Sequence, residues 1–318
     1  MERPTNWYYI SVYGRDAQRF LQGQIPVNLL HMQTRTATYS CLTLPTGKVI
    51  ATFRLYKITD YNFFILTYGE ESARRIENHL KKFAVFSDII IKVHSFVEIY
   101  LGNDTTTEYK LIGYPNNDYA EHTPYNLQFL ITDYRINPEI AKKEFGIEGQ
   151  IITGEQSLAL AALNGFVYNL EEKNCDKFLP QALGIDHLES AISYNKGCYQ
   201  GQEGIARAKF RGANTHTHVI FTFDGQIAPN FDLEQAQIFA HFSEDSNKKT
   251  GTILGIYNLA GINCQGLDFI PTENRSWIID SIINSKIIFD EEVRFSINIG
   301  EQSFELEIFK LFDMNAIK

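Results

Sequence analysis

Alternating apolar and polar positions predict β-strands through the first part of the chain. The strand-like segments are rich in β-branched and aromatic residues and cover residues 7–13, 36–44, 49–59, 61–68, 88–94, 96–101 and 127–132. Between the second and third of them, Pro45-Thr46-Gly47-Lys48 has the composition of a hairpin turn. The polar, turn-rich stretch 103–126 predicts a surface connection.

A helical period predicts four helices. The clearest covers residues 70–83, where the positions that share one face are apolar: Ala73, Ile76, Leu80 and Phe83. Two glutamates open this segment and two lysines lie near its end, as the helix dipole favours. Asp16 is expected to cap a short helix before Pro26, and two further helices are expected at 138–145 and 155–163, each followed by a glycine.

From residue 217 onward the pattern is mostly β. Strands are expected at 219–223, 237–242, 250–257, 276–282 and 293–299. The whole pattern predicts an α+β protein whose last third is a β-sandwich or barrel. No segment reaches the roughly 18 consecutive apolar residues of a membrane span, and the first residues lack the basic and apolar regions of a signal peptide. We therefore expect a cytoplasmic protein with no membrane partner.

Composition and charge argue against several classes of protein. With 318 residues, of which 44% are hydrophobic, the chain is long enough for two or three domains with a substantial core. Its four cysteines form no CxxC pair, which argues against a zinc ribbon, a self-sufficient cluster site and a disulfide scaffold. The formal net charge of −9 disfavours binding to duplex nucleic acid, because affinity for phosphate backbones depends on Lys and Arg.

Residues 196–212, KGCYQGQEGIARAKFRG, combine a single thiol with a local excess of positive charge. The four cations face one carboxylate, and the charged residues are Lys196, Arg207, Lys209, Arg211 and Glu203. Cations near Cys198 favour its thiolate, which is the form that attacks or binds metal, and the flanking glycines permit a tight loop. These residues leave several interpretations open: a nucleophile, a metal ligand, a redox sensor, a ligand cradle, or a buried cysteine in an ordinary turn.

One motif in this stretch resembles the signature of a known family. Residues 196–203, KGCYQGQE, resemble the K-G-C-Y-x-G-Q-E signature of the YgfZ family, the folate-binding, iron–sulfur-associated branch of the aminomethyltransferase-like superfamily. Further patches follow in the order that the family shows: FLQGQ at 20–24, GK at 47–48, LKKFAVFS at 80–87, LPQA at 179–182, ARAKFRGAN at 206–214 and TGTIL at 250–254. The resemblance spans nearly the whole chain and is weakest between about residues 95 and 150.

The resemblance implies a three-domain cloverleaf around a central opening. Domain one would comprise residues 1–45 and 119–205, domain two an α/β insert at 46–118, and domain three a C-terminal β-barrel at 206–318. It also implies tetrahydrofolate as a ligand and a role in the assembly or repair of 4Fe–4S proteins, including enzymes that methylthiolate tRNA. The partners would be iron–sulfur carrier or client proteins, with a transient or shared iron–sulfur cluster. The protein would then act on an enzyme and need not hold the RNA.

The resemblance gives roles to side chains of the KGCYQGQE segment. Cys198 is the expected functional thiol, and it could supply one ligand to a shared cluster or accept a sulfur or thiol adduct. Lys196 and Glu203 are the other catalytic candidates, although Glu203 could equally be a structural cap. Lys196 and Arg207 are also candidates for stabilising the thiolate form of Cys198 or for binding the glutamate tail of folate.

The candidate folate-binding residues are Trp7, Tyr199, Gln202 and Arg207. Family members place a second tryptophan against the folate, and this chain has Ser157 at that position. The carboxylate that binds the pterin edge is replaced near Leu163. Either folate affinity is weak for this reason, or Asn164 substitutes as a neutral partner, and we expect folate to bind less tightly than in relatives. No resident metal site is expected.

Two residues of this chain bear on whether the protein is an enzyme or an accessory protein. Aminomethyltransferases carry paired aspartates after the hairpin glycine, and Ala51 and Thr52 stand at those positions here. Neither side chain can shuttle a proton at neutral pH. We therefore expect an accessory protein, and the alternative is a tetrahydrofolate-dependent, aminomethyltransferase-like one-carbon enzyme.

Overall fold

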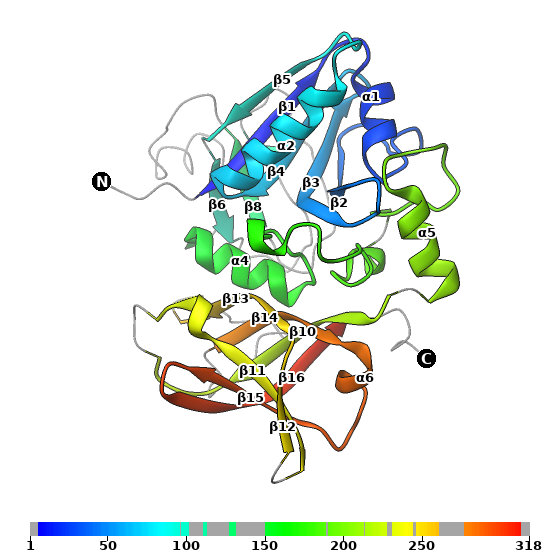
Figure 1. The fold of residues 1–318 in the computed structure, drawn as a ribbon. Helices are drawn as coiled ribbons and strands as arrows, with labels where there is room; N and C mark the ends of the chain where they lie inside the picture. Colours follow the sequence, from blue (N-terminus) through cyan, green and yellow to red (C-terminus); the bar gives the residue numbers. More distant parts are fainter. Residues whose placement is uncertain are drawn as a thin grey trace.

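The structure is a computed structural model that describes residues 6–95, 97–101, 111–112, 127–131, 150–188, 190–212, 214–227, 231–243, 246–260 and 277–312. The expected helix at 138–145, the stretch 103–126 and Cys264 lie outside the described residues, apart from the short strand at 111–112. The N-terminal sheet occupies the upper half of Figure 1, the C-terminal strands the lower half, and a helix, α4, lies between them.

Five antiparallel strands form the N-terminal sheet. Their order is β2-β3-β4-β1-β5, and their bounds are β1 (Trp7–Tyr13), β2 (Thr36–Thr43), β3 (Val49–Thr59), β4 (Asn62–Tyr68) and β5 (Ile90–His94). The predicted turn joins β2 to β3, and the Leu44 N–H donates to the Lys48 carbonyl at 2.9 Å. The sequence prediction of these five strands is confirmed, with small differences at their ends.

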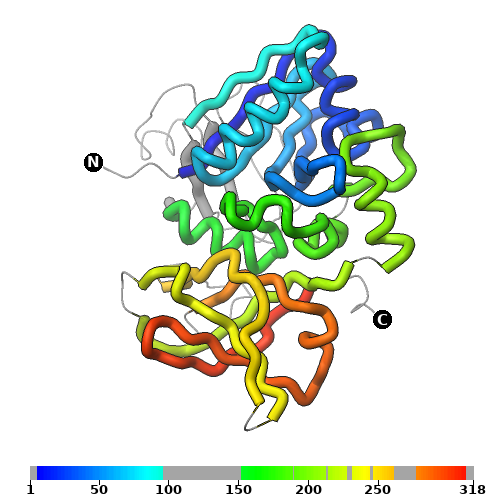
Figure 2. The backbone as a smooth tube through the Cα atoms, viewed as in Figure 1, coloured from blue at the N-terminus to red at the C-terminus, as the bar shows by residue number. Residues whose placement is uncertain are grey.

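Two helices, α1 (Ala17–Gln24) and α2 (Glu70–Phe83), share a hydrophobic core with one face of this sheet. Residues at alternate positions of β1, Ile10 and Val12, belong to the same buried cluster as Leu21 of α1 and Ile76 of α2. The opposite face of the sheet does not contribute to this core and contacts other parts of the chain. Figure 2 traces the path of the chain through both helices.

Two details of these helices differ from the sequence prediction. Asp16 precedes α1, but its carboxylate makes no capping bond to that helix and instead accepts a hydrogen bond from the Asp88 N–H at 2.9 Å. Phe83 was expected in the buried stripe of α2 and is 43% exposed, one turn past the last buried residue, Leu80. The Phe83 ring lies 5.6 Å from the Lys82 ammonium and 5.1 Å from the His79 ring centre, both on α2 itself.

Seven antiparallel strands form the C-terminal sheet. Their order is β12-β11-β15-β16-β10-β14-β13, and their bounds are β10 (His216–Phe223), β11 (Gln237–Ser243), β12 (Ser246–Thr250), β13 (Thr252–Asn258), β14 (Trp277–Asn284), β15 (Arg294–Ile299) and β16 (Gln302–Phe312). Gly251, with a φ of +73°, divides the expected strand 250–257 into β12 and β13. The sequence prediction omits β16, which lies inside the sheet and has only two buried side chains, Leu306 and Phe312.

The remaining described elements are a small sheet, helices and short 3₁₀ turns. A four-stranded sheet of order β7-β8-β6-β9 comprises β6 (Val97–Leu101), β7 (Leu111–Ile112), β8 (Leu127–Ile131) and β9 (Gln150–Ile151). The helices are α4 (Gly154–Leu163), α5 (Gln202–Arg211), the single turn α6 (Ser285–Ile288), and the 3₁₀ turns η1 (Glu172–Asn174), η2 (Ile185–His187) and η3 (Leu233–Gln235). In the part of the chain that is described, no helix has the length and apolar character needed to cross a membrane.

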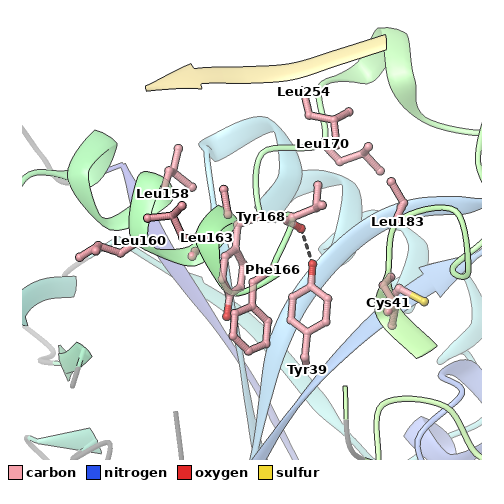
Figure 3. Close-up of a cluster of buried hydrophobic side chains, with 14 of the residues drawn as sticks. Tyr39, Cys41, Leu158, Leu160, Leu163, Phe166, Tyr168, Leu170, Leu183 and Leu254 are labelled. Atoms are coloured by element: carbon pink, nitrogen blue, oxygen red, sulfur yellow. Dashed lines mark hydrogen bonds between the residues drawn. The ribbon is translucent and has the colours of Figure 1, made fainter. Parts of the chain in front are cut away.

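The helix α4 is buried on nearly all sides. It begins with a capping box, in which the Thr153 hydroxyl accepts from the Gln156 N–H and the Gln156 side chain accepts from the Thr153 N–H. Its leucines join a cluster that includes Tyr39 and Cys41 of β2, as Figure 3 shows. The Tyr39 hydroxyl donates to the Val167 carbonyl within this cluster. Together with the sheets, this arrangement confirms the predicted α+β class.

Candidate functional site

Cys198 lies on an exposed loop directly before α5. The loop ends at Gly201, whose φ of +82° lies in the left-handed region, and α5 begins at Gln202. Cys198 is exposed, whereas Tyr199 beside it is buried. Exposure of Cys198 is what a functional thiol requires, and the interpretation of Cys198 as a buried cysteine in an ordinary turn is wrong.

Lys196 anchors this loop to the end of α1. Its ammonium donates to three backbone carbonyls, those of Gln22 at 2.6 Å, Ile25 at 2.8 Å and Val27 at 2.7 Å. These bonds use all three donors of an ammonium group. Burial lowers the pKa of Lys196 to about 7. In this placement Lys196 positions the loop, and none of its donors remains for the thiol or for a ligand carboxylate.

Gln200 fixes the same loop to the β2 strand. Its carboxamide donates to the Thr43 carbonyl at 2.8 Å, and the Thr43 hydroxyl donates to the Gln200 carbonyl at 2.9 Å. The Gln200 N–H also donates to the Gly23 carbonyl at 3.1 Å. Two segments that are far apart in the sequence, FLQGQ and KGCYQGQE, are therefore bonded to one another.

Glycines allow the start of α5 to pack against the turn between β2 and β3. A Cβ atom on Gly47 would lie 2.9 Å from the Gly204 Cα and 3.0 Å from the Gly201 carbonyl oxygen. A Cβ on Gly204 would overlap the Thr46 carbonyl oxygen. This close approach of two backbones requires residues without side chains, and it brings the third matching patch, Gly47-Lys48, to the thiol loop.

The charged residues after Cys198 lie on a helix and not on its loop. Arg207 donates to the Glu203 carboxylate at 2.6 Å across one turn of α5, and both side chains are mostly exposed. The Lys209 ammonium lies 5.6 Å from the Tyr194 ring. The cations expected near the thiol are thus spread along α5, a helix that was not predicted from the sequence.

A cavity of about 990 Å³ lies beside the thiol loop. Its walls come from the segment after α1, from β2 and β3, from the end of α4, from residues 187–195 and from β16. Ser193, Tyr194 and Asn195 line it and lead directly to Lys196 and Cys198. Among the described lining residues, Asn195 is the last one of this loop, so Cys198 follows the wall of the cavity without being part of it.

Polar and cationic groups are placed around this cavity. Arg54 is 1% exposed, with its guanidinium 3.4 Å from the Tyr168 hydroxyl and 5.1 Å from the Phe166 ring centre. Asn164 donates to the Leu160 carbonyl at 3.0 Å, but its Oδ1 atom is buried without a hydrogen-bond partner in the described structure. Burial lowers the pKa of Lys310, whose ammonium lies 3.4 Å from the Leu163 carbonyl.

Arg54 and Lys310 line this cavity and were not predicted from the sequence. A signal for Arg54 was present, because it is a cation inside the apolar strand VIATFRLYKIT, where a charge is costly unless it has partners. Lys310 lies on the omitted strand β16. Asn164 was predicted to replace a carboxylate, and it does line the cavity.

The other candidate folate residues lie in the core or on α5. Trp7 is 1% exposed, and its indole N–H donates to the Ser157 hydroxyl at 2.9 Å. The two positions that the family resemblance assigns to tryptophans are therefore in direct contact. Tyr199 is buried 4.9 Å from the Lys196 ammonium, and Gln202 is half-buried at the start of α5. A role of these residues in binding folate stays a prediction.

The two positions where aminomethyltransferases carry aspartates are fully buried. Ala51 belongs to the core beneath α1 and α2, and the Thr52 hydroxyl donates to the Val167 carbonyl. Thr52 therefore has a structural partner, and neither residue titrates near neutral pH.

The described cysteines have different environments. Cys41 is buried and its pKa is raised by burial, Cys175 is half-buried and donates to the Ile50 carbonyl at 3.2 Å, and Cys198 is exposed. Within the described ranges, no group of three His, Cys, Asp or Glu side chains is placed to hold a metal ion. The described residues therefore do not fit a four-ligand cluster held by this chain alone.

Comparisons with known proteins identify relatives of this chain. No model of a known protein family matches it. It is 30% identical over 259 residues to an uncharacterized protein of Haemophilus influenzae, covering 81% of this chain and 84% of that protein. It is also 30% identical over 281 residues to the tRNA-modifying protein YgfZ of Edwardsiella ictaluri, covering 81% of this chain and 80% of the relative.

A solved structure shares the fold. The glycine cleavage system aminomethyltransferase T from Bartonella henselae superposes with a TM-score of 0.62 at 11% sequence identity. The superposition covers 96% of this chain and 83% of that protein. At this low identity the likeness concerns the fold alone, which is aminomethyltransferase-like.

Proposed function

The chain belongs to the YgfZ family, and we propose that it binds tetrahydrofolate and supports the assembly or repair of 4Fe–4S proteins. Its clients would include enzymes that methylthiolate tRNA, in keeping with the relative that is named a tRNA-modifying protein. The partner is an iron–sulfur carrier or client protein, in the cytoplasm. The thiol that this chain presents to it is Cys198.

One observation carries the proposal. Cys198 is exposed, and Ser193–Asn195, a few residues before it in the chain, form part of the wall of a cavity of about 990 Å³. A cavity of this size can enclose a cofactor-sized ligand. The Lys196 and Gln200 hydrogen bonds fix the loop between them, so ligand binding in the cavity and the position of the thiol are linked through one short segment.

The residues of the cavity fit the chemistry of a folate. The buried Oδ1 atom of Asn164 can accept a hydrogen bond from an amino or N–H group of the pterin. Arg54 and Lys310 are cations that suit the carboxylates of the glutamate tail. When bound, tetrahydrofolate supplies nitrogen atoms that carry one-carbon units.

Among the described cysteines Cys198 alone is exposed, and this limits what it can do for a cluster. A 4Fe–4S cluster normally has four protein ligands, and Cys198 can supply one of them while the partner protein supplies the others. Its exposure permits that approach. The cluster is then cargo that passes between proteins.

Calorimetry with tetrahydrofolate tests the ligand. We expect binding to the wild-type protein and about tenfold weaker binding to Asn164→Leu and Lys310→Ala, because each loses one polar contact to the ligand. Lys248→Ala on β12 is the matched control and keeps wild-type affinity. No heat at millimolar tetrahydrofolate, or unchanged affinity in both cavity variants, would overturn this assignment.

The aminomethyltransferase-like fold favours a second function, a tetrahydrofolate-dependent one-carbon enzyme. Ala51 and Thr52 argue against it, because they leave the reaction without its usual proton-transferring carboxylates. Formation of methylenetetrahydrofolate from tetrahydrofolate and an aminomethyl donor would establish the enzyme. We expect none.

We extend the proposal to the layout of the chain. The chain would divide near residues 118 and 205 around the folate cavity, and the C-terminal sheet would close into a barrel. A boundary near residue 45 would cut the N-terminal sheet between its paired strands β2 and β3, so we do not include it. The two edge strands of that sheet, β12 and β13, are consecutive in the chain. Their adjoining positions support closure of the sheet. Limited proteolysis that cuts near these boundaries would support the division.

A further inference from the structure

A second cavity, of about 760 Å³, lies on the N-terminal sheet. It occupies the face opposite α1 and α2, since its β1 residues Tyr9, Ser11 and Tyr13 alternate with the core residues Ile10 and Val12. None of its described lining residues also lines the first cavity. The proposed folate site gives it no role.

Aromatic rings form much of its wall. The Tyr9 and His94 rings are stacked, with centres 4.3 Å apart and an interplanar angle of 6°. The Ser11 hydroxyl is hydrogen-bonded to the His94 Nε2 atom at 3.1 Å, which fixes the imidazole. Tyr13 and Tyr61 add two further rings, and Tyr61 is 62% exposed on the turn before β4. Flat rings at a cavity wall suit a planar ligand.

Two cations stand at the same cavity. Lys92 lies opposite Ser11 in the sheet, and its ammonium is 6.0 Å from the Tyr13 ring centre. Arg15 follows β1 and pairs with Asp88 at 3.3 Å, with both side chains mostly exposed. Exposed pairs of this kind are weak, so a phosphate group can compete for the guanidinium.

A polar atom of the wall also lacks a partner. The Oδ1 atom of Asn62, opposite Tyr13 in the sheet, is buried without a hydrogen bond to any described residue. A buried acceptor of this kind is costly unless a ligand or water donates to it. The exocyclic amines and ring N–H groups of nucleobases are suitable donors.

We propose that this cavity binds a nucleotide, with its base against the tyrosine rings and its phosphate on Lys92 and Arg15. The flat rings match the face of a base, the unsatisfied amide acceptor matches its edge, and the cations match the phosphate of a nucleotide. Every base has a flat face that can stack on an aromatic ring, so we expect little preference among bases. The net charge of −9 disfavours binding to the phosphate backbones of a duplex. A single nucleotide that is bound largely by stacking depends much less on the net charge of the protein.

The nucleotide can come from two sources, a free mononucleotide or a unit of single-stranded RNA. Titration calorimetry with AMP and with a five-nucleotide oligouridylate distinguishes them. Binding of AMP alone, or of both with similar affinity, assigns the cavity to free nucleotides. Tighter binding of the oligonucleotide assigns it to RNA. Binding of neither at millimolar concentration overturns the proposal.

Variants locate the binding. Tyr61→Ala and Lys92→Ala are both on exposed side chains, and each is expected to weaken AMP binding about tenfold or more by removing stacking or charge. Phe242→Ala and Lys248→Ala, exposed residues of the C-terminal sheet, are the matched controls and keep wild-type affinity. If all four variants bind AMP with equal affinity, AMP does not bind in this cavity and the proposal is overturned.

Two ligand controls separate this inference from the folate site. Inorganic phosphate should bind more weakly than AMP, and equal binding would contradict a role for the rings. Saturating tetrahydrofolate should leave AMP affinity unchanged, because the two cavities share no described lining residue. Loss of AMP binding in the presence of tetrahydrofolate would mean that AMP occupies the first cavity. If tetrahydrofolate does not bind, the proposed folate site is wrong, and the AMP titration still tests the second cavity independently.

Discussion

Lys196 is two residues before the exposed thiol, yet its ammonium is bound to the backbone carbonyls of Gln22, Ile25 and Val27. Three short hydrogen bonds favour the charged form, while burial disfavours it and lowers the pKa to about 7. The outcome is a lysine that holds a loop in place. The chemistry of the loop is left to Cys198, which is exposed beside it.

Replacing Lys196 tests this anchoring role. Lys196→Met leaves three carbonyl oxygens without their donor, and we expect a loss of about 2 kcal/mol or more in the free energy of unfolding. Urea denaturation at neutral pH measures it. Lys177→Met, on an exposed lysine, is the control and should change stability by less than about 0.5 kcal/mol. A loss no greater than that of the control would contradict anchoring.

The pKa of Lys196 predicts a pH dependence of that loss. The folded pKa of about 7 lies below the ordinary value of 10.5, so the unfolded chain binds more protons between these pH values. The free energy of unfolding of the wild type therefore rises with pH in this window, relative to a variant without the group. We expect the difference between wild type and Lys196→Met to be larger at pH 9 than at pH 7. An equal difference at pH 7 and pH 9 would contradict this and would show that the carbonyls keep the ammonium charged in the folded protein.

At the scale of elements, α5 is held by backbone contacts. Gly201 and Gly204 bring its first turn against Thr46 and Gly47 of the turn between β2 and β3. The N-terminal sheet thereby determines where α5 begins and where the thiol loop before it lies.

Two glycines of the same segment provide a matched pair of substitutions. Gly204→Ala would place a methyl group on the Thr46 carbonyl oxygen, and we expect a loss of about 1–3 kcal/mol in stability. Gly197→Ala meets nothing within 4 Å and should change stability by less than about 0.5 kcal/mol. Chemical denaturation of both variants measures this contrast, and equal losses would rule out the close packing as its cause.

Local patterns determined which elements the sequence could predict. The acidic start and basic end of α2 and the composition of the turn at residues 45–48 depend on neighbouring residues, and both predictions are confirmed. The helix α5 was not predicted, because Gly201 and Gly204 are typical of a loop. In the structure these two positions require glycine because the backbone of another turn approaches them closely. The partners of Lys196 are about 170 residues away in the sequence, so no local pattern indicates them.

At the scale of the whole molecule, the first cavity is lined by both halves of the chain. Tyr39 and Arg54 come from the N-terminal sheet, Asn164 follows α4, and Lys310 comes from β16 of the C-terminal sheet. A ligand that contacts all of them would join the two sheets. The motifs indicated a folate-type family, and only the fold could show that β16 reaches the cavity.

Thermal unfolding tests this coupling. Tetrahydrofolate at 100 times its dissociation constant should stabilise the protein by about 2.7 kcal/mol and raise Tm by several degrees. Lys310→Ala should reduce the shift at the same ligand concentration, and Lys248→Ala should not. A tetrahydrofolate-dependent shift that is equal in both variants would show that β16 takes no part in binding.

The central claim is that the exposed thiol of Cys198 serves 4Fe–4S proteins, and it is tested most directly in cells that lack this protein. Methylthiolated tRNA nucleosides are measured after expression of the wild type, Cys198→Ser or Cys175→Ser, with the amount of each protein checked. We expect Cys198→Ser to give the level of cells without the protein, and Cys175→Ser, a change at a half-buried thiol, to give the wild-type level. Wild-type levels of methylthiolation with Cys198→Ser would contradict the account.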